Sequence, residues 1–375
     1  MLYPPQQPLV HFEPRQPRQP LNLSNPYTYA IGAGAVMLLF LLFIAINNHL
    51  ESQHAREAAI AAATPPRTRQ SAADAESPQD HYAPSPDAPP APPSADDFPP
   101  LGPAESPAPG ITLYAPGRFP TGAPSAQSMN VLVLIPEKNP RSPLPCVFVG
   151  PAGTPLITGN TFSLAGDSPE LYPYVRAGFA VCMYSLDGPK PDHPTNDQVF
   201  DAYDKFRTAD AGLLNARRAM DFITARAPMI DANRFFVAGH SSAATLALLV
   251  AAHEPRVKAC AAYCPILDIT GQNPQAWPVM EHYRPGFMSF ITDHSPITFA
   301  ARLTSIPVLV FGSREDHVAD TANFPGFINR INAAGGHGSI AIVATGDHYQ
   351  AMIQQGIPRG VALFEQVLRS MGQSP

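Results

Sequence analysis

Short apolar runs alternate with helical patterns from residue 110 to the end of this 375-residue chain, and this alternation restricts the possible folds more than any other feature. Apolar runs of about four to eight residues between polar or turn-forming residues are typical of strands. Strands are expected at 131–135, 146–149, 180–184, 234–238, 259–263, 308–311 and 339–344. Helices are expected at 170–177, 196–226, 242–252, 321–334 and 359–371. Because the later strands have no polar face, the sequence predicts an α/β fold with a mostly parallel sheet and helices on both faces.

Proline marks a different kind of segment. The chain contains 46 prolines, and they are denser before residue 110 than after it. Residues 64–109 combine proline with alanine, serine and acidic residues and offer almost nothing apolar to bury, so they are typical of an extended linker. We therefore predict a juxtamembrane segment and acidic linker over 47–109, followed by one domain over 110–375.

Residues 29–46 form an uncharged, apolar run that is long enough to cross most of a bilayer's hydrocarbon core as a helix. Arg15 and Arg18 precede the run and only Arg56 follows it closely, so the positive-inside rule places residues 1–28 in the cytoplasm. We expect a single-pass membrane protein whose main domain is extracytoplasmic, or periplasmic if the source is bacterial. A signal peptide cleaved within 58–63 is the alternative.

Charge and composition exclude some functions. The net charge is −6 and the pI about 6.0, so no basic face is available and no nucleic-acid partner is expected. The 12 histidines are not spaced as metal ligands, and we expect no metal and no cofactor. The four cysteines lie in or beside expected strands, which predicts buried free thiols, with a Cys146–Cys182 disulfide as the alternative.

A turn of small residues joins an expected strand to an expected helix at Gly-His-Ser-Ser-Ala, residues 239–243. This pattern is typical of a nucleophile elbow, in which a serine occupies a tight turn and its neighbours must be small. Ser241 is the candidate nucleophile. A turn closed by a serine N-cap would explain Ser241 or Ser242 without any catalysis.

A serine nucleophile needs a base and an orienting acid, and both have candidates in loops that follow later strands. Asp316 comes after the strand at 308–311, and His348 comes after the strand at 339–344. Because the carboxyl ends of parallel strands share one edge of the sheet, these loops and the elbow should converge there. The sequence therefore predicts a triad of Ser241, Asp316 and His348.

Other residues could fill the same roles. His317 and Asp347 are direct neighbours of the chosen acid and base, and Asp268 follows the strand at 259–263. Asp316 is preferred to Asp268 because it lies one strand closer to the histidine loop.

An oxyanion hole requires two N–H groups near the nucleophile. One is expected from Ser242, the residue after the nucleophile, and the other from the loop that follows the strand at 146–149. Pro151 in that loop has no N–H, so Ala152 is the candidate, with Gly153 as the alternative.

Residues 270–292 interrupt the alternation of strands and helices and are expected to form a cap over the catalytic edge. Its aromatic residues Trp277, Tyr283 and Phe287 are candidates for lining an acyl or aryl pocket. Packing of the cap onto the main domain is an equally good interpretation of each.

These motifs together resemble a known family. Residues 129–371 resemble an α/β-hydrolase, and the run 295–318, with Ser-Pro-Ile, Ile-Pro-Val-Leu-Val-Phe-Gly and Asp-His-Val, is similar to catalytic domains of prolyl-oligopeptidase-type and dienelactone-hydrolase-type enzymes. The Asp-Ala-Asn-Arg sequence at 231–234 fits the same pattern. The resemblance implies that Ser241 is the nucleophile, Asp316 the orienting acid and His348 the general base.

The chain departs from the family at three places. Val149 stands where a histidine is usual, Ala243 replaces a glycine, and no β-propeller precedes the hydrolase region, which counts against an oligopeptidase. The sequence thus predicts a membrane-anchored serine hydrolase that cleaves a small-molecule carboxylic ester through an acyl-enzyme intermediate. A serine peptidase or amidase acting on a peptide is one alternative, and a catalytically inactive hydrolase-fold binding module is another.

Overall fold

The structure is a computed structural model that describes residues 93–125, 127–138 and 143–372. The chain divides into two units, Met1–Asp87 and Ala88–Pro375, and the described residues all belong to the second. The membrane helix expected at 29–46 and most of the expected linker lie outside the described residues. Within the part of the chain that is described, no helix has the length and apolarity to span a membrane.

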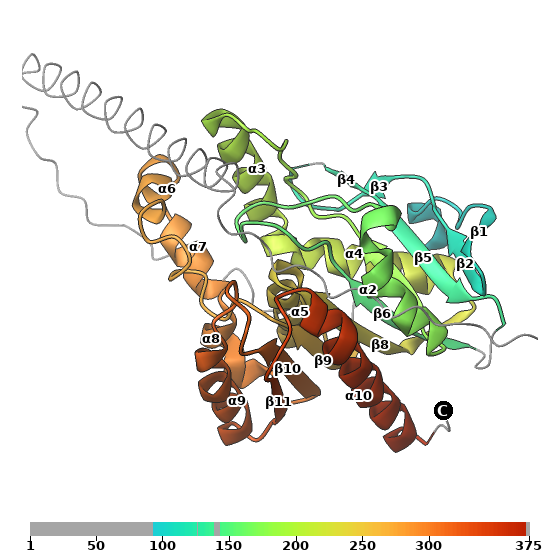
Figure 1. Ribbon diagram of the computed structural model, residues 1–375. Helices are drawn as coiled ribbons and strands as arrows, with labels where there is room; N and C mark the ends of the chain where they lie inside the picture. Colours follow the sequence, from blue (N-terminus) through green and yellow to red (C-terminus); the bar gives the residue numbers. More distant parts are fainter. Residues whose placement is uncertain (1–92, 126, 139–142, 373–375) are drawn as a thin grey trace, which may run out of the picture. The chain divides into compact units, whose positions relative to one another are not determined.

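A nine-stranded sheet forms the centre of the domain (Figure 1). Its order is β1-β2-β5-β7-β6-β8-β9-β10-β11. The strands are β1 (Ala104–Ala108), β2 (Ile111–Tyr114), β5 (Val131–Pro136), β6 (Leu144–Val149), β7 (Ala180–Tyr184), β8 (Ile230–His240), β9 (Val257–Tyr263), β10 (Pro307–Ser313) and β11 (His337–Val343). The six strands from β7 to β11 pair in parallel, whereas β1, β2 and β5 pair antiparallel to their neighbours. A mostly parallel sheet, as predicted, is confirmed.

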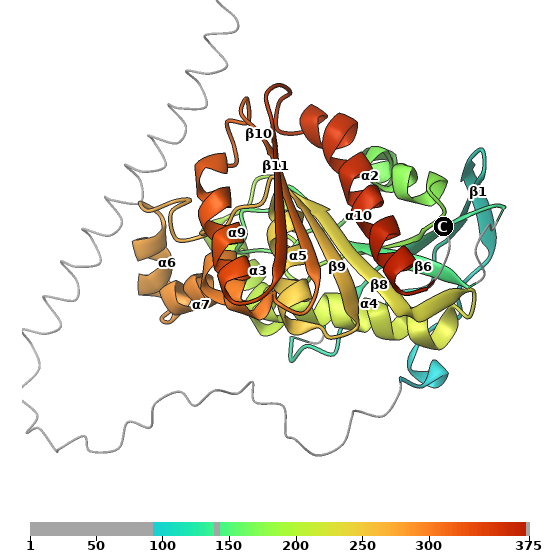
Figure 2. The same ribbon diagram turned by 90° about the horizontal axis from the view of Figure 1, so that it is seen from below.

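Helices cover both faces of this sheet (Figure 2). Two of them, α2 (Leu164–Arg176) and α10 (Ile357–Ser370), pack against each other on one face. On the other face lie α4 (Leu213–Arg226) and α5 (Ser242–His253), with α9 (Phe324–Ala333) beside β11. The helix α5 is buried on almost all sides, because the sheet lies on one side and α4 and α8 (Pro296–Phe299) on the others. It therefore carries the elbow on a rigid support.

The long helix expected at 196–226 is broken in the structure. It consists of α3 (Asn196–Thr208) and α4, separated by a turn at 210–212. Asp210 and Ala211 both have φ 52°, and Gly212 has φ 88°. A Cβ at Gly212 would lie 2.9 Å from the Leu186 side chain, so the turn needs glycine at that place.

The folded domain begins earlier than residue 110, where the sequence placed its start. Phe98 is 4% exposed and packs edge-on against Phe119 and Phe222, at ring-centroid distances of 5.3 and 5.8 Å. Arg226 donates hydrogen bonds to the Phe98 carbonyl from Nε and Nη2, at 3.1 and 2.6 Å. A short sheet of β3 (Phe119–Pro120) and β4 (Ser128–Met129) lies beside this contact. The strand β1 contains polar residues and proline, so a search for apolar runs does not detect it.

The insertion between β9 and β10 folds as α6 (Trp277–Tyr283), α7 (Phe287–Asp293) and α8. Its apolar side chains and those of α3 form a second core that is separate from the main one. The members of this core are Ile157, Tyr203, Ile269, Trp277, Met280, Phe287 and Ile291. The cap therefore shares this core with α3, a segment that lies far from it in the sequence.

All four cysteines are free and buried. Cys146 and Cys182 lie on the adjacent strands β6 and β7, but Cys146 pairs with Ala180 and Cys182 with Phe148. The alternative disulfide is not formed.

Candidate active site

The elbow at Ser241 has a strained backbone. β8 ends at His240 and α5 begins at Ser242, and between them Ser241 has φ 56° and ψ −122°. Positive φ is unfavourable for a residue with a Cβ, and strained residues of this kind cluster at active sites. The Ser241 N–H donates to the Tyr263 carbonyl at 2.9 Å. At Gly239 a Cβ would lie 2.2 Å from the Ala243 carbonyl oxygen, so the close approach of strand and helix requires glycine there.

An acid and a base meet at the same edge of the sheet. His348 Nδ1 lies 2.7 Å from Asp316 Oδ2, and the Asp316 side chain is fully buried. The other carboxylate oxygen accepts the N–H groups of Val318 and Ala319, at 2.8 and 3.0 Å. Burial raises the pKa of Asp316, but these hydrogen bonds outweigh burial and the pKa lies below its ordinary value. An ionised Asp316 keeps the proton of His348 on Nδ1, which leaves Nε2 as a base.

The basic nitrogen of His348 lies beside the elbow and is unoccupied. Nε2 is buried and has no hydrogen-bond partner among the described residues. The His348 ring is 4.5 Å, centroid to centroid, from the ring of His240, the residue before Ser241. The structure therefore does not join Ser241 Oγ to His348 Nε2 by a hydrogen bond, and such bonds often form only when substrate is bound.

The other candidate acids and bases are engaged elsewhere. Asp268 is exposed and its Oδ1 accepts the N–H and hydroxyl of Thr270, at 2.9 and 2.6 Å. Asp347 is exposed and accepts the N–H groups of the two residues that follow His348. The side chain of His317 is exposed. Of the candidates, the structure brings only Asp316 and His348 together.

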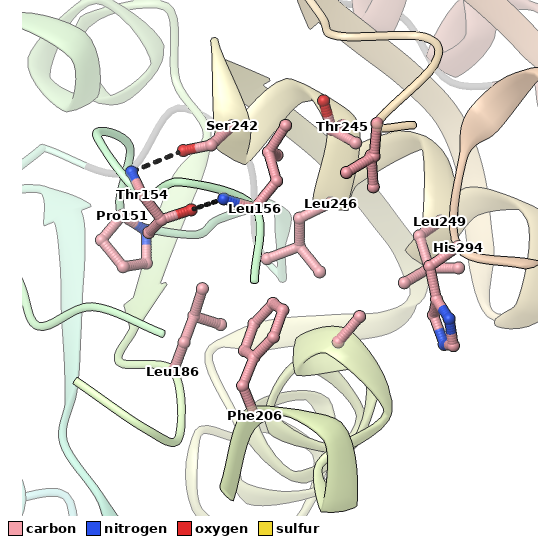
Figure 3. A pocket seen from close by; sticks show the side chains of 12 residues that line it. Pro151, Thr154, Leu156, Leu186, Phe206, Ser242, Thr245, Leu246, Leu249 and His294 are labelled. Atoms are coloured by element: carbon pink, nitrogen blue, oxygen red, sulfur yellow. Dashed lines mark hydrogen bonds between the residues drawn. The ribbon is translucent and has the colours of Figure 1, made fainter. Parts of the chain in front are cut away.

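The expected oxyanion loop is attached to the elbow. Ser242 is the first residue of α5, so its N–H has no acceptor within the helix. Its side-chain oxygen accepts the N–H of Thr154 at 3.1 Å (Figure 3), which fixes the loop 150–156 against the helix. The Ala152 carbonyl accepts from Asn160 Nδ2 at 2.8 Å, and Gly153 is exposed with φ 79°. Sequence reasoning missed Thr154, although its place in the loop could have indicated it.

An apolar pocket lies next to Ser242 (Figure 3). One face of α5, the loop 151–156, α3 and the cap surround about 360 Å³ of non-protein space that includes open solvent. The lining residues are Pro151, Thr154, Leu156, Leu186, Phe206, Ala211, Ser242, Thr245, Leu246, Leu249, Ile269 and His294.

The aromatic residues predicted for the pocket do not line this one. Trp277 and Phe287 are buried in the second core, and Trp277 Nε1 donates to the Ile269 carbonyl at 3.1 Å. Tyr283 is 36% exposed and packs on Phe200. Trp277 and Phe287 turn inward because Tyr203 of α3 and the cap's own apolar side chains form a core there.

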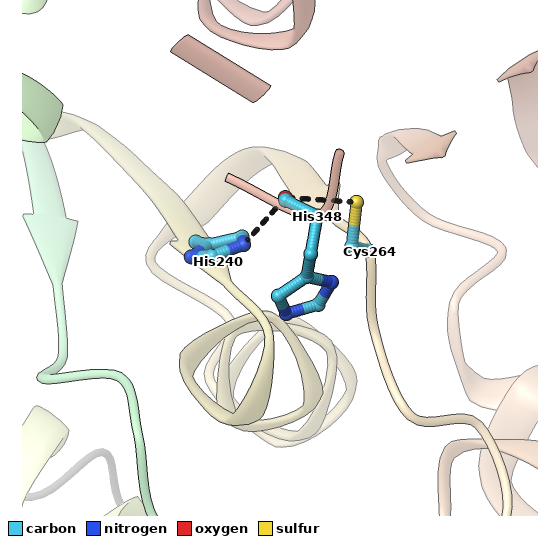
Figure 4. A group of neighbouring side chains, drawn as sticks. All are labelled: His240, Cys264 and His348. Atoms are coloured by element: carbon cyan, nitrogen blue, oxygen red, sulfur yellow. Dashed lines mark hydrogen bonds between the residues drawn. The ribbon is translucent and has the colours of Figure 1, made fainter. Parts of the chain in front are cut away.

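His240, Cys264 and His348 form a cluster whose potential ligand atoms lie within 4.8 Å of one another (Figure 4). Two of the three are engaged by the protein itself, because His348 Nδ1 faces Asp316 and His240 Nε2 lies 3.0 Å from the His348 carbonyl oxygen. Burial raises the pKa of the Cys264 thiol, which keeps the thiol protonated. Hydrogen bonds within the protein and a protonated thiol therefore account for all three members of the cluster.

Among the solved structures that resemble this one are two esterases. The chain matches an acetyl xylan esterase from Paenibacillus sp. R4 with a TM-score of 0.53 and 15% identity, over 72% of this chain and 90% of that one. It matches a glucuronoyl esterase from Solibacter usitatus with a TM-score of 0.52 and 12% identity, over 72% and 89% of the two chains. No protein-family model and no curated protein sequence matches it. The sheet order, the elbow between β8 and α5, and these two likenesses confirm the predicted architecture, and the described domain has an α/β-hydrolase fold.

Proposed function

We propose that this protein is a serine hydrolase that cleaves a carboxylic ester through an acyl-enzyme intermediate. One observation carries the proposal: the hydrogen-bonded Asp316–His348 pair holds a buried, unpaired Nε2 beside the strained serine of the elbow. A surface histidine or an N-cap serine would need neither the burial nor the strain. The acetyl xylan esterase and the glucuronoyl esterase described above are both named as esterases.

Each residue would have one role in the reaction. Ser241 Oγ attacks the ester carbonyl carbon while His348 Nε2 takes its proton, and the carbonyl oxygen becomes an oxyanion that accepts N–H groups from Ser242 and from the loop at Ala152 or Gly153. The intermediate collapses, and His348 returns the proton to the departing alcohol. Water, activated in the same way, then attacks the acyl-enzyme and releases the acid. Asp316 holds the imidazolium in both steps.

The apolar lining of the pocket supports a small, uncharged acyl group in the substrate. Most of its walls are leucine, isoleucine, phenylalanine, alanine and proline. Its polar members Ser242, Thr245, Thr154 and His294 already hydrogen-bond within the protein. A charged group placed there would lose its hydration without gaining a partner.

Labelling with a fluorophosphonate tests the nucleophile. The full chain should be labelled and should hydrolyse p-nitrophenyl esters, whereas Ser241→Ala should lose both while remaining folded by circular dichroism. Ser242→Ala is the comparison variant: it keeps Ser241 and the Ser242 main-chain N–H, so it should still be labelled, but more slowly, because it loses the hydroxyl that holds Thr154. Labelling of Ser241→Ala would contradict the assignment, no labelling of the wild-type chain would indicate a binding module, and faster cleavage of aminoacyl anilides than of esters would indicate a peptidase.

We also propose that residues 29–46 anchor the chain in a membrane, with the hydrolase domain outside the cytoplasm. The uncharged run should keep the full-length protein in the membrane fraction through high-salt and alkaline washing, because salt screens charge contacts but not apolar burial. A fragment of residues 93–375 should appear in the wash. Release of full-length protein with its N-terminus intact would contradict the anchor, and a mature N-terminus near residue 63 would show that a signal peptide had been cleaved.

A further inference from the structure

The main-chain carbonyl of His348 is held from two sides. His240 Nε2 lies 3.0 Å from the carbonyl oxygen, and the Cys264 thiol donates to the same oxygen at 3.8 Å (Figure 4). His240 is the last residue of β8, and Cys264 follows the last residue of β9. The base is therefore attached through its main chain to β8, which leads into the nucleophile, and to the neighbouring strand β9.

Only one of the two atoms in the shorter bond, His240 Nε2 and the His348 carbonyl oxygen, can be the donor. A carbonyl oxygen only accepts, so the proton of this bond belongs to His240 Nε2. Burial and the neighbouring His348 lower the pKa of His240 to about 4, so at neutral pH the ring carries a single proton, the one on Nε2. The other nitrogen, Nδ1, faces Glu170 Oε1 at 3.8 Å. His240 is 5% exposed, so the bond is shielded from water.

The hydrogen bond from His240 fixes the main-chain position of His348, which the bond from Asp316 does not. Asp316 holds the His348 ring through Nδ1 and fixes its rotation, but the position of the ring also depends on where the main chain of the loop lies. His240 and Ser241 are joined by one peptide bond, so a bond from His240 to the His348 main chain fixes the spacing between base and nucleophile. Displacement of a catalytic group by about 1 Å costs on the order of 100-fold in rate.

We propose that His240 is a positioning residue, which holds the general base at its working distance from Ser241 through the hydrogen bond from Nε2 to the His348 main-chain carbonyl. This inference rests on the proposed hydrolase function. His240 need not touch the substrate, and its effect on catalysis passes through His348.

The test compares two substitutions of nearly equal size in the full-length chain. His240→Gln keeps an amide N–H that reaches the place of Nε2, whereas His240→Met fills similar space without a donor. We expect kcat for a p-nitrophenyl ester to fall by about 100-fold in His240→Met, with KM changed by less than about twofold, and to recover at least tenfold in His240→Gln. His337→Phe, at the exposed amino end of β11, is the control and should behave as wild type.

The outcomes separate this inference from the proposed function. Equal kcat values for the Gln and Met variants, both folded by circular dichroism, would overturn the positioning role while the wild-type chain still hydrolysed the ester and was labelled at Ser241. If a fluorophosphonate did not label the wild-type chain, that result would instead contradict the hydrolase function itself. If His240→Met does not fold, His240→Phe replaces it as the variant that retains a ring without a donor, and the same comparison with His240→Gln applies.

Discussion

Asp316 and Asp268 are both candidates for the orienting acid, and their geometry in the structure distinguishes them clearly. The Asp316 carboxylate is buried and accepts two main-chain N–H groups through one oxygen and the His348 ring through the other. Asp268, one strand earlier, is exposed and holds a turn through Thr270. An orienting acid must fix a ring without competing water, and only the first site provides that.

Asp316→Asn should therefore lower kcat for an activated ester by several orders of magnitude, on the order of 10⁴ by analogy with the serine-protease triad, because an amide no longer holds the histidine in its working tautomer. Asp268→Asn is the matched control and should cost little activity. Steady-state kinetics on both variants, with thermal melts to show that they are folded, make the comparison. The opposite ranking would move the acid to Asp268.

The three triad residues could be predicted because each follows an apolar run that is recognisable as a strand, and parallel strands bring their loops to one edge. His240 was visible in the elbow motif, but its role was not, because its partner is a main-chain carbonyl 108 residues away. Glu170 gives no sequence signal at all, since a single carboxylate in an amphipathic helix reads as a surface residue.

At the scale of elements, α2 brings a carboxyl group to the end of β8. Glu170 lies on α2, is largely buried and faces His240. Burial, reinforced by Asp167, raises the pKa of Glu170 to about 7. Between the unfolded pKa near 4.5 and pH 7 the folded protein therefore binds the proton more tightly than the unfolded chain does, and the contribution of Glu170 to stability is lost as the pH rises.

Glu170→Gln should remove this pH-dependent cost. A shift of this size corresponds to about 3 kcal/mol, so relative to wild type the variant's free energy of unfolding should increase by up to that amount between pH 4.5 and 8. Urea unfolding at several pH values measures it. Glu105→Gln, on the exposed strand β1, controls for the loss of one carboxylate. A difference that does not depend on pH would contradict the raised pKa.

Strands and helices could be predicted from the sequence where a local residue pattern determines them. They could not be predicted where contacts between distant segments determine them. The buried strands β7 to β10 follow from continuous apolar runs. The break between α3 and α4 does not, because it depends on distant residues: Leu186 leaves no room for a Cβ at Gly212, and His294 of the cap pairs with Asp210. That break sets the direction of α3, and α3 in turn decides that Trp277 and Phe287 face a core and not a pocket.

At the scale of the whole molecule, the position at which the folded domain begins affects its stability. The segment 95–108 contributes the edge strand β1 and buries Phe98 against Phe119 and Phe222. These contacts lie before residue 110.

A fragment of residues 93–375 should consequently be more stable than one of residues 110–375. Removing a buried phenylalanine alone costs about 3–5 kcal/mol, and the shorter fragment also exposes the edge of β2. Urea midpoints of the two fragments measure the difference, and Phe98→Ala in the full chain isolates the part due to the ring. Equal midpoints would show that the segment adds nothing to the fold.

The cap has a consequence for anyone who wishes to redesign this protein. Arg284 of the cap pairs with Asp204 of α3 at 2.8 Å, His294 pairs with Asp210 at 2.8 Å, and the Tyr203 and Phe287 rings are in contact. The interchangeable unit is therefore discontinuous, made of the segments 196–212 and 267–299. A graft that exchanged only the second segment would leave a row of unmatched rings and charges on α3, so new specificities must be transplanted as a pair of segments.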